Sequence, residues 1–220
     1  MSNVISNEPE IVYDKQGNPH EVVDFNNDYI GAKLGFWLFI FTEIMIFGAM
    51  FLVFGFYLFQ FAQDFMDASA SLNRVLGGIN TFILLISALT MGISLVKLRN
   101  DQVKESKKYI WMTIILATIF LTIKYFEWSH EIHIGIYPGS PTLAELEHGT
   151  QLFFGLYFTM TGLHGLHIII GIGVMFWVLA LINSGKINSK DFVILENTAL
   201  YWDLVHLVWV FVFPIFYLIY

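Results

Sequence analysis

The sequence predicts an all-α integral membrane protein, a bundle of five transmembrane helices. Hydrophobic residues make up 56% of its 220 residues and charged residues only 13%. That composition leaves too little polar surface to wet a compact soluble domain. Five apolar segments are each longer than the roughly 18 residues needed to cross the hydrocarbon core of a bilayer. One of them contains no acid, Lys or Arg from Phe154 to Ile182.

The chain begins with a polar segment, residues 1–33, which we expect to be disordered or to lie on the surface. It lacks the basic and short apolar regions of a cleavable signal. The transmembrane domain follows over residues 34–220. Its five predicted spans are Leu34–Phe61, Val75–Val96, Tyr109–Trp128, Leu152–Ile182 and Phe192–Tyr220.

Basic residues are concentrated in two of the linkers between these spans. Lys97–Lys108 contains five Lys or Arg residues and Asn183–Asp191 contains two, whereas His130–Gln151 contains three glutamates and no Lys or Arg. Linkers rich in Lys and Arg remain in the cytoplasm. We therefore expect a cytoplasmic N-terminus and, with five spans, an external C-terminus.

Several ionisable side chains lie inside the spans, where they usually face another helix or a functional cavity. His164 and His167 are one turn apart and share a face of the fourth span. Glu196, Asp203 and His206 share a face of the last span, at spacings of seven and three residues. We predict that these five residues form a buried polar layer within the bundle.

The first and third spans carry further candidates. Glu43, about two turns inside the cytoplasmic end of the first span, is a candidate for a proton-linked role, or for a structural or lipid contact. Lys124 and Glu127 are one turn apart in the third span and predict an ion pair near the outer interface. There the lysine would extend toward the headgroups.

Other interpretations stay open on the residues alone. Patterns of the form E-x-x-H begin at Glu127 and Glu145, and such pairs occur in di-iron carboxylate bundles. His164 or His167, together with His206, has the ligand type and depth for haem. The same histidines can instead hydrogen-bond to neighbouring helices as packing residues. The absence of cysteine excludes disulfides and thiolate metal sites, and a net charge of −7 is not typical of nucleic-acid binding.

Five motifs resemble subunit III of the haem–copper terminal oxidases. They occur in the order and spacing of that family and extend from Lys33 to Tyr220. The motifs are KLGFWLFIFTEIMIFGAMF, INTFILLISALTMG, KYFEWSHEI, MTGLHGLHIIIG and ENTALYWDLVHLVWVFVFPIFYLIY.

The chain departs from the family pattern in two places. It lacks the first two helices of the seven-helix mitochondrial form and therefore resembles the five-helix bacterial form. In the last helix the family reads Y-W-H-x-x-D, whereas Asp203 precedes His206 here. The two positions remain one turn apart, so a contact between them can survive, but their partners on other helices would differ.

The resemblance implies a non-catalytic accessory subunit of a bacterial respiratory oxidase that uses cytochrome c or quinol. We expect no catalytic centre, cofactor or metal in this chain, since haem and copper belong to partner subunits. Expected partners are oxidase subunits I and II and membrane lipids, with bound phospholipid and support for proton uptake. The expected location is the bacterial inner (plasma) membrane. The alternatives are an integral haem or di-iron redox enzyme and a related subunit that assists nitric oxide reductase.

Overall fold

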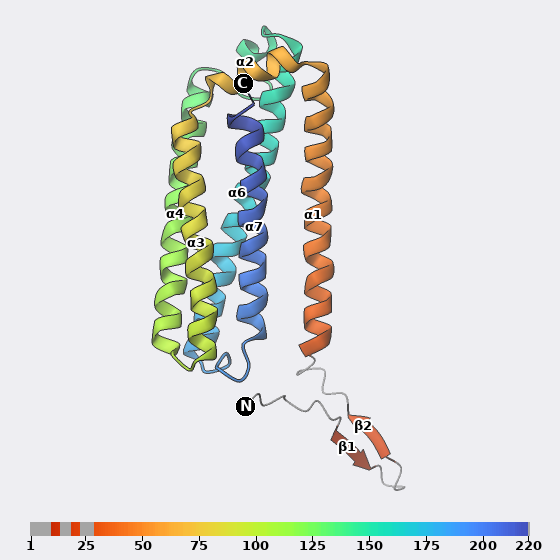
Figure 1. Cartoon of the computed structure of the whole chain (residues 1–220), viewed down its shortest axis with the longest axis vertical. Helices are drawn as coiled ribbons and strands as arrows, with labels where there is room; N and C mark the ends of the chain where they lie inside the picture. Colours follow the sequence, from red (N-terminus) through yellow and green to blue (C-terminus); the bar gives the residue numbers. More distant parts are fainter. Residues whose placement is uncertain (1–9, 14–18, 23–28, 220) are drawn as a thin grey trace.

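A computed structural model describes residues 10–13, 19–22 and 29–219 of the chain (Figure 1). Strands β1 (Glu10–Tyr13) and β2 (Pro19–Val22) pair antiparallel, with Glu10 opposite Val22. The sequence did not predict this hairpin in the polar N-terminal segment. Residues 29–33 of that segment belong to the first long helix, and its other residues lie outside the described part of the chain.

The prediction of five membrane-spanning helices is confirmed. Within the described residues, five helices are long and apolar enough to cross a membrane. These helices are α1 (Tyr29–Gln60), α3 (Arg74–Arg99), α4 (Val103–His133), α6 (His148–Asn183) and α7 (Val193–Tyr217). Two shorter helices, α2 (Ala62–Ser71) and α5 (Pro141–Ala144), lie in the linkers and were not predicted.

The helices extend beyond the apolar runs from which the spans were predicted. Helix α4 begins six residues before Tyr109 and α1 begins five residues before Leu34. The apolar run measures the segment that lies in hydrocarbon. Backbone hydrogen bonds continue through polar residues such as Lys104, because helical geometry does not require an apolar environment.

Helix α3 is held against α4 and α7 by small and polar side chains. Thr90 Oγ1 and Thr113 Oγ1 are 2.7 Å apart across the α3–α4 contact. Trp202 of α7 donates its indole N–H to Ser87 Oγ at 3.1 Å. Small residues allow helices in lipid to approach closely enough for such hydrogen bonds.

Helix α1 lies at the side of the bundle next to α7 (Figure 1). It is the least enclosed span. Only 17% of its most apolar 18-residue stretch is buried within the protein, compared with 33–50% for the corresponding stretches of the other four spans. Much of the α1 surface is therefore available to lipid or to another subunit.

Helix α2 lies across one end of the bundle (Figure 1). Ser69 donates to Phe216 O at 2.7 Å, which joins α2 to the end of α7. Asp64 Oδ2 accepts from Gly149 N at 3.1 Å, in the first turn of α6. A carboxylate at this position satisfies a free backbone N–H and interacts favourably with the helix dipole.

The two basic linkers lie at the same end of the bundle as the start of α1 (Figure 1), and we predict that this end is cytoplasmic. Ser106, near the end of the first linker and in the first turn of α4, is buried, so the exposed Asn100 is the better site for a reporter. In intact cells, Asn100→Cys should resist a membrane-impermeant maleimide and exposed Glu145→Cys should react. The parent chain has no cysteine to interfere. The reverse labelling pattern would contradict this orientation.

Candidate functional site

An acid and an imidazole meet between α1 and α6. Glu43 Oε2 lies 2.8 Å from His167 Nε2, and each side chain is 12% exposed. The other ring nitrogen, Nδ1, is 2.8 Å from Leu163 O. Because a carbonyl oxygen only accepts, Nδ1 carries a hydrogen and donates it. The Glu43–His167 contact therefore shares one proton, which lies either on the imidazole or on the carboxyl group.

Aromatic rings orient this pair. The Phe47 ring meets His167 edge-on, with centroids 5.4 Å apart. Tyr201 of α7 stacks on the imidazole at 6.4 Å and donates its hydroxyl to His167 O at 3.0 Å. Three helices thus fix the geometry of the pair and limit its contact with water.

A groove of about 300 Å³ lies beside the pair, between α1, α6 and α7. Its lining is mostly apolar and aromatic and consists of Phe36, Phe39, Ile170, Val174, Trp177, Ile194, Asn197, Thr198 and Tyr201. Asn197 Oδ1 is shielded and has no hydrogen-bond partner among the described residues. The groove can therefore hold an apolar chain.

Glu43 lies near the middle of α1, farther from the start of the helix than the apolar run alone suggested. The prediction placed it about two turns from the cytoplasmic end of its span. In the structure the span begins at Ile30, and 13 residues of helix measure about 20 Å. Glu43 is consequently close to the middle of α1, because the helix continues through the residues before Leu34.

Glu196 forms an ion-pair network at the end of the bundle that carries the basic linkers. Its Oε2 is 2.8 Å from Lys33 Nζ, and its Oε1 is 2.7 Å from Arg99 Nη2. The Arg99 guanidinium also lies 4.9 Å from the centre of the Phe192 ring. This network joins the ends of α1, α3 and α7 and is separate from the Glu43–His167 pair.

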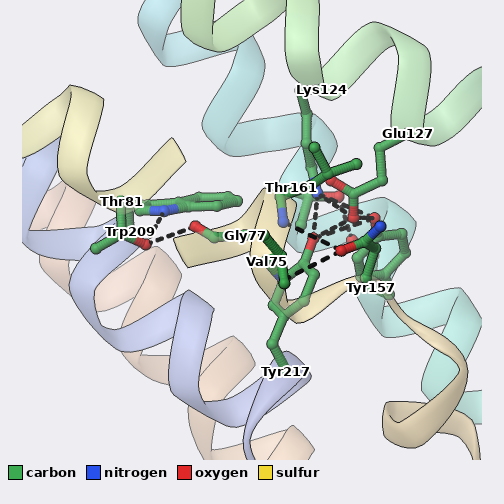
Figure 2. A network of polar contacts seen from close by, with 11 residues as sticks. Val75, Gly77, Thr81, Lys124, Glu127, Tyr157, Thr161, Trp209 and Tyr217 are labelled. Atoms are coloured by element: carbon green, nitrogen blue, oxygen red, sulfur yellow. Dashed lines mark hydrogen bonds and ion pairs between the residues drawn. The ribbon is translucent and has the colours of Figure 1, made fainter. Parts of the chain in front are cut away.

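A second polar cluster lies near the opposite end of the bundle, where α7 ends at Tyr217. Figure 2 shows this cluster from close by. Lys124 Nζ is 3.2 Å from Glu127 Oε1 and donates to Tyr157 Oη at 2.9 Å and Tyr217 Oη at 2.6 Å. Tyr157 donates to Glu127 Oε1 at 2.7 Å, and Tyr217 donates to the same oxygen. The ammonium group, one carboxylate oxygen and two phenols from α4, α6 and α7 thus bind one another, while the buried Glu127 Oε2 has no hydrogen-bond partner among the described residues.

Lys124 does not extend toward the headgroups as predicted. Its side chain is 7% exposed, and its Nζ lies 5.2 Å from the centre of the Trp209 ring. A buried ammonium needs several acceptors or aromatic faces around it. The tyrosines and Trp209 supply these groups inside the bundle, so the lysine has no need to reach the surface.

The five residues of the predicted buried polar layer do not lie in one layer, because Glu196 belongs to the ion-pair network at the end of the bundle and Asp203 is exposed. His164 is buried, stacked on Trp209 with centroids 5.1 Å apart, and its ring nitrogens have no hydrogen-bond partner among the described residues. His206 is only partly buried. Spacing along a helix identifies a shared face but does not determine how that face is turned within the bundle.

The sequence model of cytochrome c oxidase subunit III matches residues 24–220, nearly the whole chain. The chain belongs to this subunit III family. Quinol oxidase subunit 3 of Bacillus spizizenii is 32% identical over 193 residues, covering 84% of this chain and 85% of the relative. A protein of Staphylococcus haemolyticus named "Probable quinol oxidase subunit 3" is 30% identical, covering 85% of this chain and 88% of the relative.

A third relative has a different organisation. The heme-copper oxidase subunit I+III of Aeropyrum pernix is 27% identical over 202 residues, which cover 89% of this chain but 23% of the relative. Membership in the subunit III family identifies this protein as an accessory subunit of a haem–copper terminal oxidase, and it implies a complex with subunit I. With its five apolar helices, the chain is a multi-pass plasma membrane protein.

The E-x-x-H pairs considered for metal binding do not form a metal site in the described part of this subunit III. Among the described residues, no three His, Cys, Asp or Glu side chains are grouped so that they could hold a metal ion. Glu127 is buried in its cluster, whereas His130 is exposed, and Glu145 and His148 are both exposed. The two E-x-x-H pairs therefore do not converge. His167 uses both ring nitrogens within the chain.

Sequence reasoning missed the tyrosines and cations that complete these sites. Tyr157 and Tyr217 complete the Lys124 cluster, Tyr201 orients His167, and Lys33 and Arg99 bind Glu196. A tyrosine in an apolar helix is a weak signal, because its ring packs equally well in a core or at an interface. A buried lysine is a stronger signal that acceptors must come from neighbouring helices.

Proposed function

We propose that this chain is the third subunit of a quinol-oxidising haem–copper oxidase. In this proposal it packs on subunit I, binds phospholipid in the groove between α1, α6 and α7, and supports proton uptake through Glu43 and His167. The names of the Bacillus and Staphylococcus relatives support quinol as the electron donor. The observation that carries the proton-linked role is the 2.8 Å contact between the two side chains.

The Glu43–His167 pair has the chemistry of a proton-holding site. Its shared proton can lie on either partner, and both partners are largely shielded from water. General acid–base groups work at hydrogen-bond distance, and imidazole is the side chain that most often fills this role. Asn197, Thr198 and Tyr201 line the adjacent groove, and the Tyr201 hydroxyl reaches the backbone carbonyl of His167.

The groove supports the lipid part of the proposal. It is lined by aromatic and branched side chains from three helices, and its volume of about 300 Å³ suits an apolar ligand. Phe36 lies one turn from Lys33, and Asn197 follows Glu196, so the groove begins near the Lys33–Glu196–Arg99 network. Charged groups at that end suit a phospholipid headgroup, with an acyl chain along Phe39 and Trp177.

Glu43→Gln tests the proton-linked role. Glutamine has the same size and can still donate to His167 Nε2, so assembly should remain largely intact, but the pair can no longer exchange a proton. Oxygen consumption with a quinol as donor, per assembled complex, should fall several-fold. The loss should be greatest at high pH, where proton supply limits turnover.

Glu105→Gln is the matched control, since it removes an exposed carboxyl group from α4. It should leave the pH profile unchanged. If Glu43→Gln also matches the parent from about pH 6 to about pH 9, Glu43 is a structural or lipid contact and the proton-linked role is lost.

A further inference from the structure

Asp203 differs from the other acids described above within the spans. Glu43, Glu127 and Glu196 each have a cationic or imidazole partner within the chain. Asp203 is exposed, and no described residue forms a hydrogen bond or ion pair with it. It is the eleventh residue of the 25-residue helix α7, so it lies about 15 Å from the start of that helix. An exposed carboxyl group therefore sits near the middle of a helix that is long and apolar enough to cross a membrane.

The surface around Asp203 is otherwise apolar. Leu207, Val210 and Phe211 follow it along the outer face of α7 and are 48%, 38% and 54% exposed. Phe211 lies 6.0 Å from Phe51, so α1 borders this face on one side. We refer to Asp203, Leu207, Val210 and Phe211 as the outer face of α7. Next to it lies α1, the least enclosed span.

Lipid tails cannot complement this face, because hydrocarbon offers no hydrogen-bond donor to a carboxyl group. Polar groups at this depth are normally turned toward protein or a water-filled cavity. A second copy of the chain is also a poor fit, since a two-fold contact through this face would present it with the same patch and its acid. The outer face of α7 is therefore best complemented by a different protein chain, one that supplies a hydrogen-bond donor to the carboxyl group of Asp203.

We propose that the outer face of α7 docks on subunit I of the oxidase, which presents a basic or hydrogen-bond-donating side chain to Asp203. This inference rests on the proposed function and adds to it the docking face and the residue that sets its register. The Aeropyrum relative, named for subunits I and III in one chain, supports a partner held beside this subunit.

Photo-crosslinking from single cysteines tests the face. The chain has no native cysteine, so Leu207→Cys and Val210→Cys can each carry a benzophenone in the purified complex. Both should give a product with subunit I. The control is Ile115→Cys on α4, which is 55% exposed and should react with lipid. Products from Leu207→Cys that contain only lipid, or a second copy of this chain, would overturn the proposal.

Substitution of Asp203 tests the chemistry. Asp203→Leu should lower the amount of this chain retained with subunit I about tenfold, and Asp203→Asn should lower it less, because the amide still accepts a hydrogen bond. Neither variant should lower the thermal stability of the isolated chain, since Asp203 has no partner among its described residues. Unchanged or increased retention of Asp203→Leu would show that lipid covers this face.

Copurification of the parent chain with subunit I distinguishes a failure of the proposed function from a failure of the docking inference. If the parent does not copurify with subunit I, the proposed function fails. If the parent copurifies but crosslinks arise from Ile115→Cys and not from the outer face of α7, only the docking inference fails.

Discussion

Lys124→Met should destabilise the chain by about 3–5 kcal/mol, because it leaves the buried carboxylate of Glu127 without its cation. Glu127 is 4% exposed in its side chain, and both tyrosines of the cluster already donate to it. At that burial, bulk solvent cannot take the place of the ammonium group. The free energy of unfolding, measured by denaturant titration in detergent micelles, gives the magnitude.

The chain contains a matched control for this substitution. Lys108 and Glu105 form an ion pair on the same helix with the same three-residue spacing, but their side chains are 66% and 49% exposed. Lys108→Met should therefore cost less than about 1 kcal/mol. Equal losses for the two lysine variants would show that the buried cluster contributes no more than a surface pair.

A double substitution identifies the source of the loss. Glu127→Gln removes the charge that Lys124→Met leaves unpaired, so the double variant should be less destabilised than the sum of the single variants. The expected coupling is about 1–3 kcal/mol. Strict additivity would contradict a direct interaction between Lys124 and Glu127.

Gly171→Ala should destabilise the contact between α6 and α7 by about 1–3 kcal/mol, because the added methyl group overpacks it. A Cβ at this position would lie 2.8 Å from Trp202 Cζ3 and 3.3 Å from Tyr201 Cε1. Trp202 cannot move away easily, since it is almost fully buried and its indole N–H is bonded to Ser87. Thermal denaturation of the purified complex measures the loss.

Gly173 is the control for this prediction. It lies in the same helix, and a Cβ there meets no atom within 4 Å. Gly173→Ala should be neutral or stabilise the helix by up to about 1 kcal/mol, because alanine has the higher helix propensity. The Gly171→Ala loss should shrink when Trp202→Phe is added, since phenylalanine is smaller. If it does not, the collision with Trp202 is not its cause.

The five spans could be predicted from the sequence because the length of an apolar run is a local property. The Lys124–Glu127 contact was also within reach, since residues three apart share a helix face. Glu43 could be identified as an unusual acid from its apolar neighbours alone. Its partner could not, because His167 is 124 residues away and the contact depends on the packing of α1 on α6.

The sequence by itself determined the number of membrane-spanning helices, the family, and which ionisable residues lie within those spans. Only the tertiary structure decided which of these residues meet and which face outward. A helix in lipid is apolar on all sides, so its hydrophobic pattern does not mark the buried face as it does in a soluble protein. The rotation of each helix depends on close packing, as where Gly171 meets Trp202. That packing turns Asp203 to the surface and brings Tyr157 and Tyr217 to Lys124.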